Sequence, residues 1–431
     1  MGLCSFVSSS VGIEPQAVDS GSNRTGRFAP DDGQKESIVG LSLFMILLIV
    51  VLAGWFWLSI LKRLDRYRSD KKSYTEIAAF FMFGLLSIIP TIILNEISLF
   101  IASFLWGFNE TVNEFFYEFL IVGPVEEFSK FIIFVTAART MRSVREPRDA
   151  VLQAAAVALA FASVENVSYG VWYGFGILLE RSFLTVLGHM IYSTLWSVPY
   201  AIMVYGRRKR EPDLRIGPLL RYVVPAAFIH GLYNFLLHLD GLGLALILDG
   251  IVLVVAVVMY VTLVKESPYK KYSLEECDQA IARIKPGLRS NPDSYLLNKR
   301  MGLYRLYKGN YKAALLYFNR CVRVRLTRND AWFYRAVTLL LIGREEAGRN
   351  SLRRALLRAT EKQRLSLYRW AEKLVADETV MIRLREEFDA FEVLRELYGK
   401  KEPRFKVRDP WKYRDRKARL WSGYALVRNA E

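Results

Sequence analysis

Long apolar stretches alternate with short polar segments over the first two thirds of the chain. An α-helix needs roughly 20 apolar residues to cross a bilayer, and stretches of about that length or longer lie near residues 37–61, 75–107, 115–138, 150–176, 182–205, 218–238 and 243–264. The second is longer than one span requires and contains Pro90, which favours a kinked or split helix. The pattern predicts an all-α fold, a polytopic membrane helix bundle with about seven spans.

After residue 265 the pattern becomes that of amphipathic helices. The segment Gly309-Asn310-Tyr311 recurs 34 residues later as Gly343-Arg344-Glu345, and this period is that of tetratricopeptide helix pairs. The alternative is two unrelated helical hairpins. Both predict a soluble α-helical domain after the membrane bundle.

Composition divides the chain further. Residues 1–36 are polar and lack the basic start of a cleaved signal peptide, and residues 403–431 mix Lys and Arg with Trp and Tyr. We therefore expect an external polar segment (1–36), an intramembrane domain (37–265), a cytoplasmic tetratricopeptide-like helical domain (266–402) and a basic aromatic tail (403–431).

Charge predicts how the bundle is oriented. Basic and acidic residues balance over residues 1–265, so the formal net charge of +17 belongs to the rest of the chain. With seven spans, the Lys- and Arg-rich loops near residues 62–72, 139–148 and 207–210 all fall on one side. Cytoplasmic loops carry such residues. We expect a multi-pass cell (inner) membrane protein with its N-terminus outside and its C-terminal domain cytoplasmic.

Ionisable residues inside the predicted spans are the main pointer to function. A charge at the bilayer centre costs roughly 2.5–3.5 kcal/mol on insertion scales, so several of them are tolerated only when they face one another. Four consecutive spans each carry polar residues three or four apart, which places them on one helix face. The sets are Glu126, Glu127 and Lys130; Glu165 and Tyr169; His189 and Ser193; and His230 and Asn234. Buried acids with buried imidazoles suit proton transfer or hydrolysis.

These motifs resemble the PrsW family of intramembrane proteases, distant relatives of the CAAX prenyl proteases and bacteriocin-processing enzymes. The resemblance rests on Glu-Glu-Phe-Ser-Lys (126–130), Glu-Asn-Val-Ser-Tyr (165–169), His-Met-Ile-Tyr-Ser (189–193) and His-Gly-Leu-Tyr-Asn (230–234). It covers roughly residues 37–265 and implies hydrolysis of a peptide bond in a membrane-protein substrate, such as an anti-sigma factor or another signalling protein.

The resemblance also implies roles for the residues. Glu126 or Glu127 would activate water while Lys130 fixes the other carboxylate, and His230 and Asn234 would stabilise the oxyanion. Glu165 would share a proton with His189 or ligate a metal, and Tyr169 would donate to Glu165 or to the substrate.

The sequence does not decide between a metal-free and a metal-dependent reaction. The favoured mechanism requires no cofactor, because glutamate activates the water. The alternative is a zinc site made by Glu165, His189 and His230, since two imidazoles and a carboxylate with an open position form a zinc-like ligand set. No His-Glu-x-x-His motif is present.

Two other classes of function compete with the protease. One is a proton-coupled transporter or channel, since buried acids and histidines also occur there, although the spans show no internal two-fold repeat of the kind many transporters have. The other is a non-catalytic scaffold that recruits partners through its helical repeats. Expected partners are a transmembrane substrate, the lipid bilayer and a cytoplasmic peptide bound by the repeats; nucleic acid is not expected.

Overall fold

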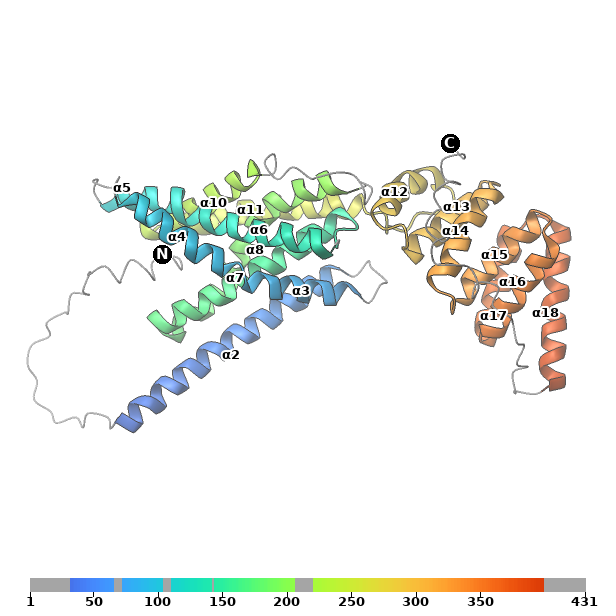
Figure 1. Cartoon of the computed structure of the whole chain (residues 1–431), viewed down its shortest axis with the longest axis horizontal. Helices are drawn as coiled ribbons and strands as arrows, with labels where there is room; N and C mark the ends of the chain where they lie inside the picture. Colours follow the sequence, from blue (N-terminus) through green and yellow to red (C-terminus); the bar gives the residue numbers. More distant parts are fainter. Residues whose placement is uncertain (1–31, 66–71, 104–109, 142, 206–219, 399–431) are drawn as a thin grey trace, which may run out of the picture. The chain divides into compact units, whose positions relative to one another are not determined.

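The computed structural model describes residues 32–65, 72–103, 110–141, 143–205 and 220–398, and these residues form helices and no strand. They divide between Val324 and Arg325 into two compact units. Most of the predicted segment 1–36 and all of the predicted tail 403–431 lie outside the described residues. Figure 1 shows the helices in chain order.

The part of the chain predicted to be intramembrane is a bundle of helices, as the sequence predicts. They are α2 (Asp32–Leu64), α3 (Lys72–Leu85), α4 (Ile88–Ala102), α5 (Glu110–Tyr117), the π-helical turn η1 (Glu118–Val122), α6 (Gly123–Met141), α7 (Pro147–Tyr173), the 3₁₀ turn η2 (Phe175–Ile177), α8 (Leu178–Val204), α10 (Val223–His238) and α11 (Leu242–Lys265).

Four helical segments are long and apolar enough to cross a membrane: Gly40–Leu64, Thr75–Ala102, Pro147–Tyr173 and Leu242–Lys265. The other three predicted spans coincide with α6, α8 and α10. Of these, α10 is apolar but short, and α6 and α8 carry the polar residues of the predicted site. The all-α membrane bundle is confirmed, and the count of seven spans stays a prediction.

The second predicted span is split, but just before Pro90. The break falls at Leu86 and Ser87, whose N–H groups bond three residues back to Phe83 and Gly84. Pro90 is then the third residue of α4, in the first turn, where the missing N–H has no intrahelical partner to lose.

Helix α7 is the centre of the bundle. Within its apolar window 83% of the residues are buried, against 11% for α2. Its middle is a run of alanines and other small residues, which lets neighbouring helices approach closely. Gly84 of α3 uses this space, since a Cβ there would lie 2.5 Å from the carbonyl oxygen of Val157. The start of α7 is fixed by a capping box between Glu146 and Asp149.

The remainder of the described chain is a helical soluble region. Its helices are α12 (Cys277–Ser290), α13 (Tyr295–Tyr307), α14 (Tyr311–Val324), α15 (Asn329–Leu341), α16 (Glu345–Arg358), α17 (Glu361–Leu374) and α18 (Glu378–Tyr398). The bounds of α13 and α14 recur in α15 and α16 at the predicted 34-residue spacing. Gly309 and Gly343 end the first helix of each pair with φ of +72° and +81°, which favours glycine. The tetratricopeptide assignment and the domain bounds stay predictions.

Candidate active site

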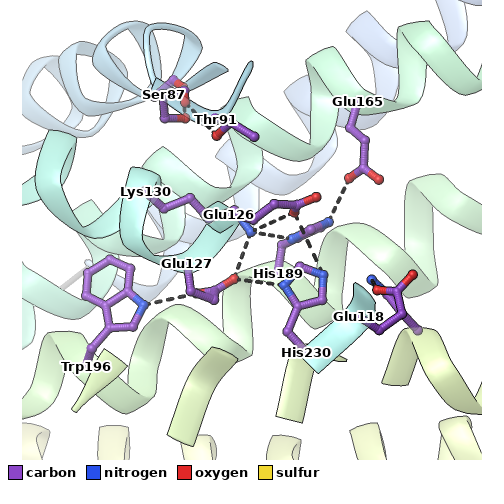
Figure 2. Close-up of polar contacts among 12 residues, drawn as sticks. Ser87, Thr91, Glu118, Glu126, Glu127, Lys130, Glu165, His189, Trp196 and His230 are labelled. Atoms are coloured by element: carbon purple, nitrogen blue, oxygen red, sulfur yellow. Dashed lines mark hydrogen bonds and ion pairs between the residues drawn. The ribbon is translucent and has the colours of Figure 1, made fainter. Parts of the chain in front are cut away.

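Helix α6 supplies a carboxylate pair and a lysine within one turn. The Lys130 Nζ lies 2.8 Å from Glu127 Oε1 and 3.5 Å from Glu126 Oε2, and all three side chains are buried. Figure 2 shows them at the centre of a polar network. The three- and four-residue spacing read from the sequence therefore does place them together.

The lysine also joins α6 to α8. Its Nζ lies 2.8 Å from His189 Nδ1 and 4.3 Å from the centroid of the Phe161 ring. An ammonium only donates, so Nδ1 accepts and the ring proton belongs on Nε2. That Nε2 lies 2.9 Å from Glu165 Oε2 of α7, to which it donates. His189 is thereby fixed at both ring nitrogens.

Glu165 has a second partner that the sequence analysis missed. Arg181, at the start of α8, donates to Glu165 Oε1 at 2.9 Å and to Asn166 Oδ1 at 3.0 Å. Its guanidinium lies 3.4 Å from the centroid of the Tyr169 ring. In the sequence Arg181 lies in a short loop between two predicted spans. Only its closeness to Asn166 along the chain, 15 residues, could have suggested the contact.

The two adjacent glutamates have different environments. Glu127 accepts hydrogen bonds from the Lys130 ammonium and, at 3.1 Å, from the indole N–H of Trp196. Its Oε1 also lies 3.2 Å from His230 Nδ1. Glu126 has only longer contacts: its Oε2 is 3.8 Å from His230 Nε2, and its buried Oε1 has no hydrogen-bond partner among the described residues.

Two further buried acids, which the sequence allows either in the cavity wall or at helix ends, border the site. Glu118, in the π-helical turn η1, accepts from the Asn234 amide at 2.9 Å. Asp249 of α11 accepts from the Tyr192 hydroxyl, and the Tyr192 ring lies 5.4 Å from that of His230. Short π-helical segments are frequent at functional sites, which is a signal that only the structure reveals.

A small cavity opens beside the network. Its volume is about 30 Å³, enough for one or two water molecules. The lining comes from α7, α8 and α10 and includes Glu165, Tyr169, Arg181, His189, His230 and Asn234. Water held there would touch both histidines.

The structure thus brings six of the predicted residues into one network: Glu126, Glu127, Lys130, Glu165, His189 and His230. Tyr169 and Asn234 line the adjoining cavity. Tyr169 stacks under Arg181, and the Asn234 amide is engaged by Glu118.

A metal-ligand set is also present, with one change from the sequence-based hypothesis. Ligand atoms of Glu126, His189 and His230 lie within 4.8 Å of one another, so Glu126 stands where Glu165 was expected. The donor types suit zinc. In the arrangement described, however, both nitrogens of His189 have protein partners within 2.9 Å.

The proteins that this chain resembles include PrsW proteases. Residues 72–264 match the family model described as "PrsW family intramembrane metalloprotease". The chain is 26% identical to Protease PrsW of Geobacillus kaustophilus (strain HTA426) over 188 residues, covering 44% of this chain and 75% of the relative. It is 26% identical to Protease PrsW of Clostridioides difficile (strain 630) over 205 residues, covering 46% and 81%.

A shorter match reaches 30% identity, over 123 residues of Protease PrsW from Shouchella clausii (strain KSM-K16), covering 28% of this chain and 55% of the relative. No solved structure matches the chain significantly. The matched residues contain the whole buried network. Residues 72–264 of this membrane protein therefore match the PrsW family of intramembrane proteases.

Proposed function

We propose that the chain hydrolyses a peptide bond of a membrane-protein substrate with water activated by Glu126. The main support is the difference between the hydrogen-bond partners of the two glutamates. Glu127 is surrounded by donors, whereas Glu126 keeps a buried oxygen with no partner. Hydrogen bonds to a carboxylate weaken it as a base, so the less engaged carboxylate is the better proton acceptor.

The charges of the cluster support the same assignment. The carboxylates of Glu126, Glu127 and Glu165 face two cations, Lys130 and Arg181. One negative charge is left over when both histidines are neutral. A buried site in that state gains by taking up a proton, as a general base must.

The reaction follows from these positions. Glu126 takes a proton from water, and the water oxygen bonds to the carbonyl carbon of the peptide. His230 would stabilise the resulting oxyanion, an interaction made only as charge develops. Glu126 then gives its proton to the amide nitrogen as the C–N bond breaks, leaving a carboxylic acid, an amine and the original carboxylate.

The remaining residues position this machinery. Lys130 holds Glu127 and His189, and Arg181 holds Glu165, which orients His189. Asn234 spans Glu118 and the cavity, so we assign it to placing His230 and the water, and Tyr169 to the cavity wall.

A metal-dependent reaction is the second candidate, because the matched family model is described as a metalloprotease. Glu126, His189 and His230 would hold the ion, which would supply Lewis acidity to water or carbonyl. The glutamate mechanism is favoured because the Lys130 ammonium engages Nδ1 of His189, one of the two nitrogens through which that ring could bind an ion.

Family resemblance and the distribution of charge suggest the substrate and the membrane topology. We infer that the substrate is a single-span protein such as an anti-sigma factor, reached from the external side. The helical region (266–402) is assigned to the cytoplasm, where it would recruit a peptide partner, and residues 1–36 to the exterior.

Mapping new protein N-termini in membranes tests the proposal. Cells carrying the wild-type chain are compared with cells carrying Glu126→Gln or His230→Ala at equal expression. Glu180→Gln is the matched control, because Glu180 is an exposed acid on α8. New termini near transmembrane segments should appear with the wild type and the control and be lost in the two variants. Termini unchanged by either variant would contradict the proposal.

A further inference from the structure

Helix α4 buries polar side chains and exposes apolar ones. Its buried residues are Thr91, Asn95 and Ala102, whereas Ile89 and Ile93 are 57% and 53% exposed. The main packing partners of α4 are η1 and α6. The polar face of α4 therefore points toward the helix that carries Glu126, and its apolar face toward lipid.

Two buried groups at this contact lack partners. Asn95 is 2% exposed and its Oδ1 has no hydrogen-bond partner among the described residues; the same holds for the Oγ of Ser129, which is fully buried on α6. Ser129 lies one turn after Val125, which packs in one cluster with Leu94 of α4. Residues four apart share a helix face, so Ser129 faces α4.

The Asn95 Oδ1 is an acceptor without a donor among the described residues, and the Ser129 hydroxyl can both accept and donate. Glu126 Oε1, also without a partner, lies one turn before Lys130 on the same helix. The hydroxyls nearby are committed: Ser87 Oγ donates to Gly84 O at 2.5 Å and Thr91 Oγ1 to Ser87 O at 2.8 Å. In the view of Figure 2, Ser87 and Thr91 lie on the side of Lys130 away from Trp196. Leaving buried acceptors unpaired is costly, which points to a ligand rich in N–H groups.

An extended peptide backbone has the right chemistry. Its N–H groups on one side recur every two residues, about 6.7 Å, so one extended segment can offer donors to more than one acceptor. A helical substrate segment has no free N–H groups to offer, because its own helix uses them. Only an unwound segment fits.

We propose that the α4–α6 seam, formed by Thr91, Asn95 and Ser129, binds the unwound backbone of the substrate beside the scissile bond, with Asn95 Oδ1 accepting from a backbone N–H. This inference rests on the proposed protease function. The cavity beside the network is lined by α7, α8 and α10, so water from it would approach from other helices than the substrate. Substrates are then membrane segments that unwind easily, such as those with Gly or Pro near the cleaved bond.

The test is the variant Asn95→Leu, which keeps the size and removes the unpaired amide. A purely structural Asn95 predicts that thermal stability and cleavage fall together. A ligand-binding Asn95 predicts an unchanged or higher melting temperature, because an unpaired buried group is removed, while cleavage of the substrate found by N-terminus mapping falls about tenfold, the loss of one hydrogen bond. Ile93→Leu on the exposed face is the control and should change neither.

Photocrosslinking separates contact from turnover. Benzoylphenylalanine replaces residue 95 or residue 93 in the full chain carrying Glu126→Gln, and the mapped substrate is co-expressed. Crosslinks to the segment around the cleavage site are expected from position 95 and not from position 93. Wild-type cleavage by Asn95→Leu, a lower melting temperature, or equal crosslinking from both positions would overturn the inference. Absence of cleavage by the wild type would instead contradict the protease function.

Discussion

Replacing each of the adjacent glutamates by glutamine should separate stability from catalysis. Glu127 accepts from Lys130 at 2.8 Å and from Trp196 at 3.1 Å, through different oxygens. Glutamine keeps one acceptor and turns an NH₂ toward the other donor. Breaking a buried charged pair costs about 3–5 kcal/mol, and Glu126 remains at 3.5 Å from Lys130, so we expect about 3 kcal/mol for Glu127→Gln. Glu126, with contacts of 3.5 and 3.8 Å, should cost about 1 kcal/mol or less.

The assay is thermal unfolding of the purified full chain in detergent, followed by tryptophan fluorescence. For a domain of this size 1 kcal/mol corresponds to about 2–4 °C. Glu127→Gln should therefore melt about 6–12 °C below the wild type and Glu126→Gln less than about 4 °C below it, while Glu126→Gln shows the larger loss of cleavage per folded molecule. A Glu127→Gln protein as stable as the wild type, or a Glu126→Gln protein that cleaves normally, would refute the reasoning.

Three other changes have definite expected outcomes. Arg181→Met should lower the cleavage rate about 10–100-fold, because Glu165, which orients His189, loses its 2.9 Å partner. An unchanged rate would show that Arg181 has no role in the site. Treatment with 1,10-phenanthroline should leave the rate of the purified protein within about twofold, and a loss restored by zinc would favour the metal-dependent candidate. Gly302→Ala should destabilise the α13–α14 hairpin by about 1–3 kcal/mol, because a Cβ there would lie 2.5 Å from the Phe318 ring; faster hydrogen exchange confined to that hairpin is the expected reading.

Helix periodicity explains why much of the site was predictable. Residues three or four apart must share a face, so Glu126, Glu127 and Lys130 were expected together, and the cost of charge in lipid required other helices to supply partners. His189, Glu165 and His230 meet that requirement. The all-α bundle followed from the length of the apolar stretches.

The missing parts depend on tertiary geometry that spacing does not encode. Arg181 reaches Glu165 because α8 begins only after the 3₁₀ turn η2. Glu118 points to Asn234 from a π-helical turn, and no local pattern in the apolar stretch announces that turn. Trp196 on α8 donates to Glu127 and so helps to decide which glutamate has fewer hydrogen bonds. In the sequence it looks like an ordinary apolar core residue.

Single-turnover cleavage is the most direct test of whether Glu126 activates the water that cuts a membrane protein. Purified wild-type and Glu126→Gln proteins are placed in liposomes with the substrate found by N-terminus mapping. We expect cleavage by the wild type and a rate about 10²–10⁴-fold lower for the variant, at similar substrate binding. Cleavage by Glu126→Gln at the wild-type rate would contradict this role of Glu126.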